Sequence, residues 1–187
     1  MLRKYLLAGW LLLLMSYSLD IFSSGTPPSH GVHVHGSAAL NVVLDGDRLF
    51  IEFDSPALNL AGFEHEPDNE AQRSTLLNVR QTLVSADRLF HFSPTKCIPE
   101  NIEIEVPFLK IHQENNPHNH HQEAQPDHAD FHADYIFHCG QSKGLKTILV
   151  KLFVFFPGIQ EIRVQWIFHG RQGFTLLTAE HPELKVN

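Results

Sequence analysis

The alternation of apolar and polar residues predicts a protein built mainly from β-strands. Residues 38–44 and 48–54 alternate with a period of two, and Gly46 between them favours a tight hairpin turn, because glycine adopts positive φ angles without a steric penalty. One face of the second strand is apolar and should be buried, namely Leu49, Ile51 and Phe53. Further strands are predicted at 89–92, 102–111, 134–138, 147–156, 161–169 and 173–178.

One segment changes to the period of a helix. Between residues 68 and 86 the apolar residues form a stripe of Leu76, Val79 and Leu83, with Leu77 and Val84 beside it. Asp68 is a suitable N-cap for this helix.

The remaining elements complete an α+β fold. The run 148–156 is almost entirely apolar and predicts a central strand. We therefore expect an antiparallel sheet with one main helix packed on a face, formed by residues 25–187 as a single domain.

The first 24 residues have the features of a secretory signal peptide. Arg3 and Lys4 precede an apolar run over residues 6–15, which is too short for a bilayer span of about 20 residues. Cleavage is expected after Ser18 or near Gly25. No second long apolar stretch follows, so we expect no stable membrane insertion once the leader is removed.

The charge balance excludes one class of function and favours another. The 187 residues include 14 Lys plus Arg and 21 Asp plus Glu, a formal net charge of −7, and the basic residues are scattered, so no nucleic-acid-binding surface is expected. Histidine is unusually frequent, since its 14 copies equal Lys and Arg together. Imidazole is a common ligand of Zn²⁺ and titrates near neutral pH.

Much of this imidazole lies in residues 112–132, which we expect to form a disordered loop. The segment is almost devoid of apolar residues and cannot bury enough surface to fold alone. Its histidines and carboxylates can supply the four ligands of Zn²⁺ in several combinations. The alternative is a solvated polar loop that binds nothing. The predicted ligands here are His112, His118, His120, His121, His128 and His132.

A second histidine cluster precedes the first strand. His33 and His35 are two residues apart, so in an extended strand both rings project from the same face and can share one ion. His30 is near enough in sequence to add a third ligand. His65 lies between Glu64 and Glu66, and this loop is a further candidate if the fold brings it near the first cluster. The alternative for these histidines is an exposed strand or loop without metal.

Cys97 and Cys139 are expected to form a disulfide, because an exported chain folds in oxidising surroundings. Closing this loop of 42 residues would stabilise the fold by roughly 4 kcal/mol on the chain-entropy model. The two cysteines bracket the histidine-rich segment, so the bond should fasten its base. The alternative is two buried free thiols. Met1 and Met15 both leave with the leader, which removes the thioether ligands that Cu(I) favours.

Three segments resemble a known family. HVHGSAALNV at 33–42, SPALNLAGFEHEP at 55–67 and DYIFHC at 134–139 follow in the order shown by the ZrgA-like periplasmic zinc-binding proteins of Gram-negative bacteria. The resemblance implies a periplasmic, zinc-regulated accessory protein that assists high-affinity zinc uptake by an ABC transporter. It supports His33, His35 and His65 as motif matches.

These observations lead to a functional hypothesis. We expect a protein without enzymatic activity that captures Zn²⁺ through its mobile histidine-rich loop and passes it to the solute-binding protein of a zinc ABC transporter. One alternative is a small zinc-dependent hydrolase built on His33, His35 and a carboxylate. Another is a nickel- or copper-binding buffer protein, because imidazole and carboxylate sites follow the Irving–Williams order. A third is an envelope module whose histidines respond to pH without metal.

Overall fold

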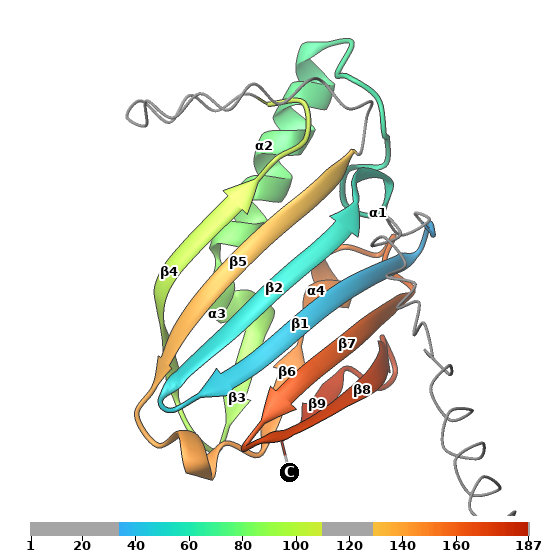
Figure 1. Ribbon diagram of the computed structural model, residues 1–187. Helices are drawn as coiled ribbons and strands as arrows, with labels where there is room; N and C mark the ends of the chain where they lie inside the picture. Colours follow the sequence, from blue (N-terminus) through green and yellow to red (C-terminus); the bar gives the residue numbers. More distant parts are fainter. Residues whose placement is uncertain (1–33, 110–128, 187) are drawn as a thin grey trace, which may run out of the picture. The chain divides into compact units, whose positions relative to one another are not determined.

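A six-stranded sheet forms the larger part of the fold in the computed structural model, which describes residues 34–109 and 129–186 (Figure 1). Its strands lie in the order β4-β5-β2-β1-β7-β8. Their bounds are β1 Ser37–Asp45, β2 Arg48–Pro56, β4 Cys97–Glu105, β5 Asp130–Cys139, β7 Glu161–Phe168 and β8 Arg171–Thr178.

A smaller sheet and several helices complete the α+β fold. The smaller sheet has the order β3-β6-β9, with bounds Phe90–Ser93, Thr147–Val150 and Glu183–Lys185. The helices are α1 Ala57–Ala61, α2 Glu70–Val84, α3 Ala86–Leu89 and α4 Leu152–Phe155, and η1 Ser142–Gly144 is a 3₁₀ turn.

The core lies between α2, the smaller sheet and one face of the larger sheet (Figure 1). On β5, the Tyr135 hydroxyl donates a hydrogen bond to the carbonyl of Leu83 on α2, at 2.9 Å. The ring of Phe90 on β3 contacts Tyr135 and Phe137 edge-on. Within the described residues, the side chains on the opposite face of β4, β5 and β2 are exposed or half-buried, so that face is open to solvent.

The hairpin of β1 and β2 confirms the prediction from alternation. Asp45 pairs with Arg48 across the turn, and Gly46 has a φ of 61°, which is the reason for glycine at this position. On β2 the expected apolar face is fully buried, formed by Leu49, Ile51 and Phe53.

Helix α2 confirms the predicted helix with small corrections. Leu76, Val79 and Leu83 are buried as expected, whereas Leu77 is half exposed. The N-cap is Asn69 rather than Asp68: its side chain accepts a hydrogen bond from the backbone N–H of Gln72 at 2.9 Å.

The larger sheet is mixed, so the prediction of an antiparallel sheet is wrong at one position. Strands β1 and β7 are parallel, from the Ser37–Glu161 pair to the Leu44–Phe168 pair. The carbonyl of Gly36 accepts hydrogen bonds from the backbone N–H groups of Gln160 and Glu161. These bonds place the first residue of β7 beside the first residue of β1. Alternation fixes which side chains face inward, but it does not fix strand direction, so the sequence pattern could not reveal this pairing.

The prediction of one strand over residues 147–156 is also wrong. Strand β6 ends at Val150 and helix α4 follows directly. The helix is short, and it buries Leu152 and Phe153 on one side while Val154 is 75% exposed. A short apolar run is compatible with a strand and with a helix, so the sequence of residues 147–156 does not show where the strand ends and the helix begins. Strand β6 is the middle strand of the smaller sheet.

The predicted disulfide is present, but it lies at the opposite end of β4 and β5 from the points where the described chain stops and resumes. Cys97 and Cys139 are bonded and face each other across β4 and β5. The described chain leaves β4 at the other end, where Glu105 pairs with His132, eight strand residues or roughly 27 Å further along. The bond therefore fastens the far end of this strand pair, and the expectation that it fastens the base of the segment is wrong.

Several predictions lie outside the described residues. These are the signal peptide over 1–24, the histidines at positions 30 and 33, and most of the loop predicted over 112–132. Within the part of the chain that the structure describes, no helix is long and apolar enough to cross a membrane.

Candidate functional site

One end of the larger sheet brings together histidines that are distant in sequence. Strands β1 and β5 begin at this end, and β2 and β4 finish there (Figure 1). The described chain stops after Leu109 and resumes at Ala129 at the same end. We call this region, with His35, His65 and His132, the histidine end.

His35 is held against the loop that follows α1. Its Nε2 donates a hydrogen bond to Oε2 of Glu64 at 3.1 Å, and the imidazole is 60% exposed. The 64–66 loop therefore lies beside His35, the one member of the cluster at 30–35 that the structure describes, which the sequence alone left open. An exposed imidazole beside a carboxylate is a suitable partial ligand set for a divalent cation.

A buried amide fixes the chain next to His35. Oδ1 of Asn59 accepts a hydrogen bond from the backbone N–H of Gly36 at 2.7 Å, and its Nδ2 donates to the carbonyl of Ser37 at 3.0 Å and to Oγ of Ser55 at 3.2 Å. Gly36 has a φ of 84°, which favours glycine. Asn59 on α1 thus links the segment after β2 to the chain at Gly36 and Ser37 and sets where β1 begins.

His65 makes its contacts within its own loop. Nδ1 donates to the backbone carbonyl of Glu66 at 2.8 Å and lies 3.6 Å from Oδ2 of Asp68. The ring lies against Phe63, with centroids 5.2 Å apart. Its Nε2 is therefore the nitrogen that a ligand can reach, because Nδ1 is engaged.

His132 belongs to β5, so the predicted loop ends before it. The ring projects from the open face of the sheet between two carboxylates. Nδ1 lies 2.6 Å from Oδ1 of Asp54 on β2, and Nε2 lies 3.1 Å from Oδ2 of Asp134 on its own strand. Partial burial lowers the pKa of His132, but hydrogen bonds and charge from the two aspartates outweigh this and raise the pKa above the ordinary histidine value.

More carboxylates surround this imidazole. Across β4, Glu105 pairs with His132 and Glu103 pairs with Asp134, and across β2, Glu52 pairs with Asp134. All lie on the open face, which makes this part of the sheet strongly acidic. Such a surface attracts cations.

Sequence reasoning found His132 and missed its carboxylate partners. Asp134 follows His132 by two residues on a strand and so had to share its face, a signal that could have been read. Asp54 pairs with His132 only through the β2–β5 register, which the sequence does not show.

Most of the predicted ligand positions fall outside the described residues. They are His30, His33, His112, His118, His120, His121 and His128. Among the residues that are described, no group of three or more His, Cys, Asp or Glu side chains is already gathered around a metal-sized space.

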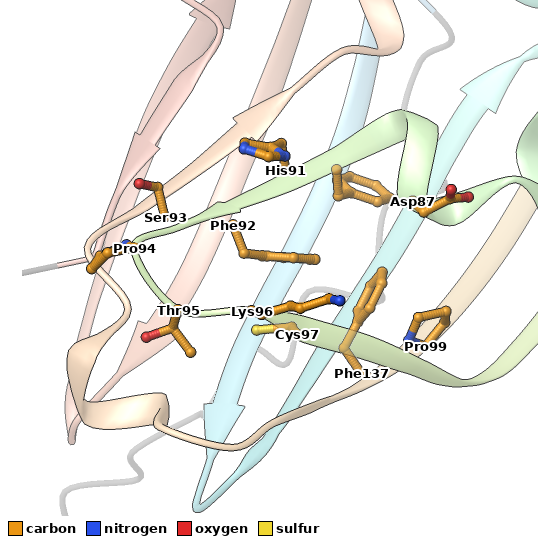
Figure 2. Close-up of a pocket in the computed structure, with 11 residues that line it drawn as sticks. Asp87, His91, Phe92, Ser93, Pro94, Thr95, Lys96, Cys97, Pro99 and Phe137 are labelled. Carbon is orange, nitrogen blue, oxygen red and sulfur yellow. The ribbon is translucent and has the colours of Figure 1, made fainter.

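The opposite end of the larger sheet has a hollow lined largely by aromatic side chains. A hollow of about 430 Å³ lies beside Cys97 of the disulfide, and Figure 2 shows the rings of Phe92 and Phe137 lining it together with Lys96 and His91. A hollow lined by phenylalanine with one imidazole is a poor zinc site, because Zn²⁺ needs several nitrogen, oxygen or thiolate ligands. His138, also away from the histidine end, lies on β5 beside Asp47, as expected for an ordinary strand residue.

The fold and the histidine end define a class of protein: an α+β protein with exposed imidazole and carboxylate side chains at one end of an open sheet. The chain belongs to the ZrgA family of zinc uptake proteins, whose model matches residues 32–186, in agreement with the resemblance seen in the sequence. No curated protein matches the chain.

Proposed function

We propose that this protein is a periplasmic accessory protein that captures Zn²⁺ at the histidine end and passes it to the solute-binding protein of a zinc ABC transporter. The observation that carries the proposal is that His35, His65 and His132 each lie beside a carboxylate at the same end of the sheet in a member of a zinc uptake family. Zn²⁺ is cargo in this proposal and not a catalytic cofactor.

The chemistry of the donors suits capture followed by release. Imidazole nitrogen and carboxylate oxygen bind Zn²⁺ at about 2.0 to 2.2 Å, and the described histidines at this end are exposed or half-buried, so a second protein can reach them. We propose that the histidines of residues 112–128 add ligands at the same end, since the chain leaves and returns there. Transfer of Zn²⁺ then proceeds as ligands of the partner protein replace the imidazole ligands one at a time.

The proposed location rests on the leader and on the cysteines. Residues 1–24 have the pattern of a secretory signal peptide, and the disulfide between Cys97 and Cys139 is the kind of bond that persists in an oxidising compartment. A partner in the same compartment is consistent with zinc uptake across the inner membrane.

The rival functions predict different metal behaviour. A zinc hydrolase keeps its ion as a resident cofactor, whereas a capture protein releases the ion to its partner. A nickel or copper buffer would not transfer zinc to a transporter protein. These alternatives are therefore separated by the transfer experiment.

The test is a zinc transfer assay with purified proteins. The chelator-stripped protein is loaded with Zn²⁺ at pH 7.5 and mixed with the zinc-free solute-binding protein, and the zinc on each is counted after separation. We expect zinc to move to the partner. The variant with His112, His118, His120, His121 and His128 replaced by Asn should bind fewer ions, whereas the matched control His91→Asn and His181→Asn should bind as many as the wild type. Failure of the wild type to bind zinc would refute the proposal.

A further inference from the structure

The open face of the sheet carries a pair of donor atoms with the spacing of two metal ligands. Nε2 of His132 and Oδ2 of Asp134 are 3.1 Å apart. Two atoms that each lie about 2.0 Å from one tetrahedral Zn²⁺ are about 3.3 Å apart. A shift of about 0.2 Å, small for two half-exposed side chains, therefore allows one ion to contact both.

The other nitrogen of the ring is held in a different way. Nδ1 of His132 lies 2.6 Å from Oδ1 of Asp54, which is too close for two ligands sharing an ion and is the distance of a strong hydrogen bond to a carboxylate. An ionised carboxylate only accepts, so Nδ1 carries the proton and Nε2 presents its electron pair when the ring is neutral. Metal-binding histidines usually donate their second N–H to a carboxylate in this way, which fixes the tautomer and the ring orientation.

Further oxygen donors border the same position. Glu105 is directly opposite His132 on β4, and Glu103 is opposite Asp134, so each Cβ atom lies about 5 Å from its partner. Both glutamates of β4 are exposed, so the side chain of Glu105 is free to turn toward His132.

We infer that His132 and Asp134 form a second, strand-based Zn²⁺ site on the open face of the sheet, with Glu105 as the third ligand and Asp54 as the residue that positions the imidazole. This inference rests on the proposed function for the identity of the metal. Water fills the remaining coordination, which leaves the site open to ligand exchange. The site is built on paired strands, so its geometry does not depend on residues 110–128.

The strand site has a role in the capture and release of zinc. An open site with three protein ligands exchanges its ion more readily than a closed site with four. Its position at the end of β4 and the start of β5 places it close in sequence to Ala129, where the described chain resumes. The strand site is thus the fixed position from which a partner protein receives the ion.

The test follows individual ring nitrogens of the whole protein. The ¹⁵N-labelled, chelator-stripped protein is titrated with Zn²⁺ at pH 7.5, and long-range ¹H–¹⁵N spectra report each imidazole. The signals of His132 are assigned by their loss in His132→Gln. We expect Zn²⁺ to shift Nε2 of His132 strongly, while Nδ1 keeps the signal of a protonated nitrogen.

Variants separate the roles of the carboxylates. Asp134→Asn should abolish the zinc-dependent shift of Nε2, and Asp54→Asn should weaken binding at this ring by 10- to 100-fold and mix its tautomers. The matched control is His138→Gln, which lies on the same face of β5 and should leave the His132 response unchanged. Backbone amide spectra verify the fold of each variant, and the wild-type titration does not depend on any variant being stable.

The outcomes distinguish this inference from the proposed function. If other imidazoles respond to Zn²⁺ and both nitrogens of His132 stay unchanged, the strand site is refuted while capture by the remaining histidines stands. If no imidazole responds and no zinc is bound, both are refuted. A shift of Nδ1 in place of Nε2 would also overturn the inference, because Asp54 could not then hold the ring.

Discussion

Replacing Asn59 by alanine should weaken both the fold and the position of His35. Asn59 is 5% exposed and makes three hydrogen bonds, to Gly36, Ser37 and Ser55. Alanine leaves the buried N–H of Gly36 without this acceptor, which costs about 1–3 kcal/mol, and it removes two further bonds that each contribute about 0.5–1.5 kcal/mol. Because the bonds share one side chain, we expect a total loss of about 2–4 kcal/mol.

The measurement is urea unfolding followed by circular dichroism. For a domain of this size, about 3 kcal/mol corresponds to a fall in Tm of roughly 6–12 °C. The control is Asn41→Ala on β1, whose Nδ2 donates only to the exposed Oε2 of Glu52 at 3.2 Å, and it should change stability by less than about 0.5 kcal/mol. Hydrogen exchange at the amides of Gly36 and Ser37 should increase in Asn59→Ala alone.

One result would refute this reasoning. If Asn59→Ala and Asn41→Ala have the same stability within about 0.5 kcal/mol, the buried amide does not hold the start of β1. The link from α1 to the position of His35 would then be wrong as well.

Three further predictions concern other parts of the fold. Tyr135→Phe removes the bond to the carbonyl of Leu83 and should cost about 1–3 kcal/mol in urea unfolding; an unchanged midpoint would contradict a buried, partnered hydroxyl. Reducing the disulfide, or replacing Cys97 and Cys139 by Ser, should lower stability by up to roughly 4 kcal/mol, measured as a fall in Tm with and without reductant, whereas a Tm insensitive to reductant would argue against the bond. In the metal-free protein the pKa of His132 is raised, so its protonated ring stabilises the fold fully below about pH 6.5, and this contribution is lost as pH rises through the folded pKa. The difference in free energy of unfolding between wild type and His132→Gln should therefore be larger at pH 6 than at pH 9. An equal difference at both pH values would refute the ion pairing.

The sequence predicted most elements because their burial is one-sided. The first hairpin alternates and has a glycine at its turn, and α2 has a single apolar stripe, so local pattern and tertiary packing agree. Residues 147–156 are almost all apolar although Val154 is 75% exposed, so the sequence pattern there does not separate a strand from a helix. The parallel pairing of β1 with β7 depends on the route of the chain through α4, which no local pattern records.

The candidate site was predictable in its donors and not in its geometry. Composition pointed to imidazole as the candidate donor, and the spacing of His33 and His35 suggested a second cluster. The composition of residues 112–132 was averaged over the whole segment, so His132 was assigned to a loop although β5 begins at Asp130. The polar residues of β5 occupy only its open face, which a test for alternation would have detected.

The placement of His132 on a strand changes what its loss should do. A histidine in a long polar segment is one of several interchangeable ligands, so removing it lowers capacity with little effect on any remaining site. A histidine fixed between Asp54 and Asp134 has no equivalent neighbour on the open face of β5, because the next outward positions are Ile136 and His138, and His138 lies beside Asp47 at the far end. Replacing His132 should therefore remove one distinct class of site from a zinc titration, whereas replacing a single histidine of residues 112–128 should lower the total number of ions without removing a class. A titration in which both replacements have the same effect would place His132 among the interchangeable ligands after all.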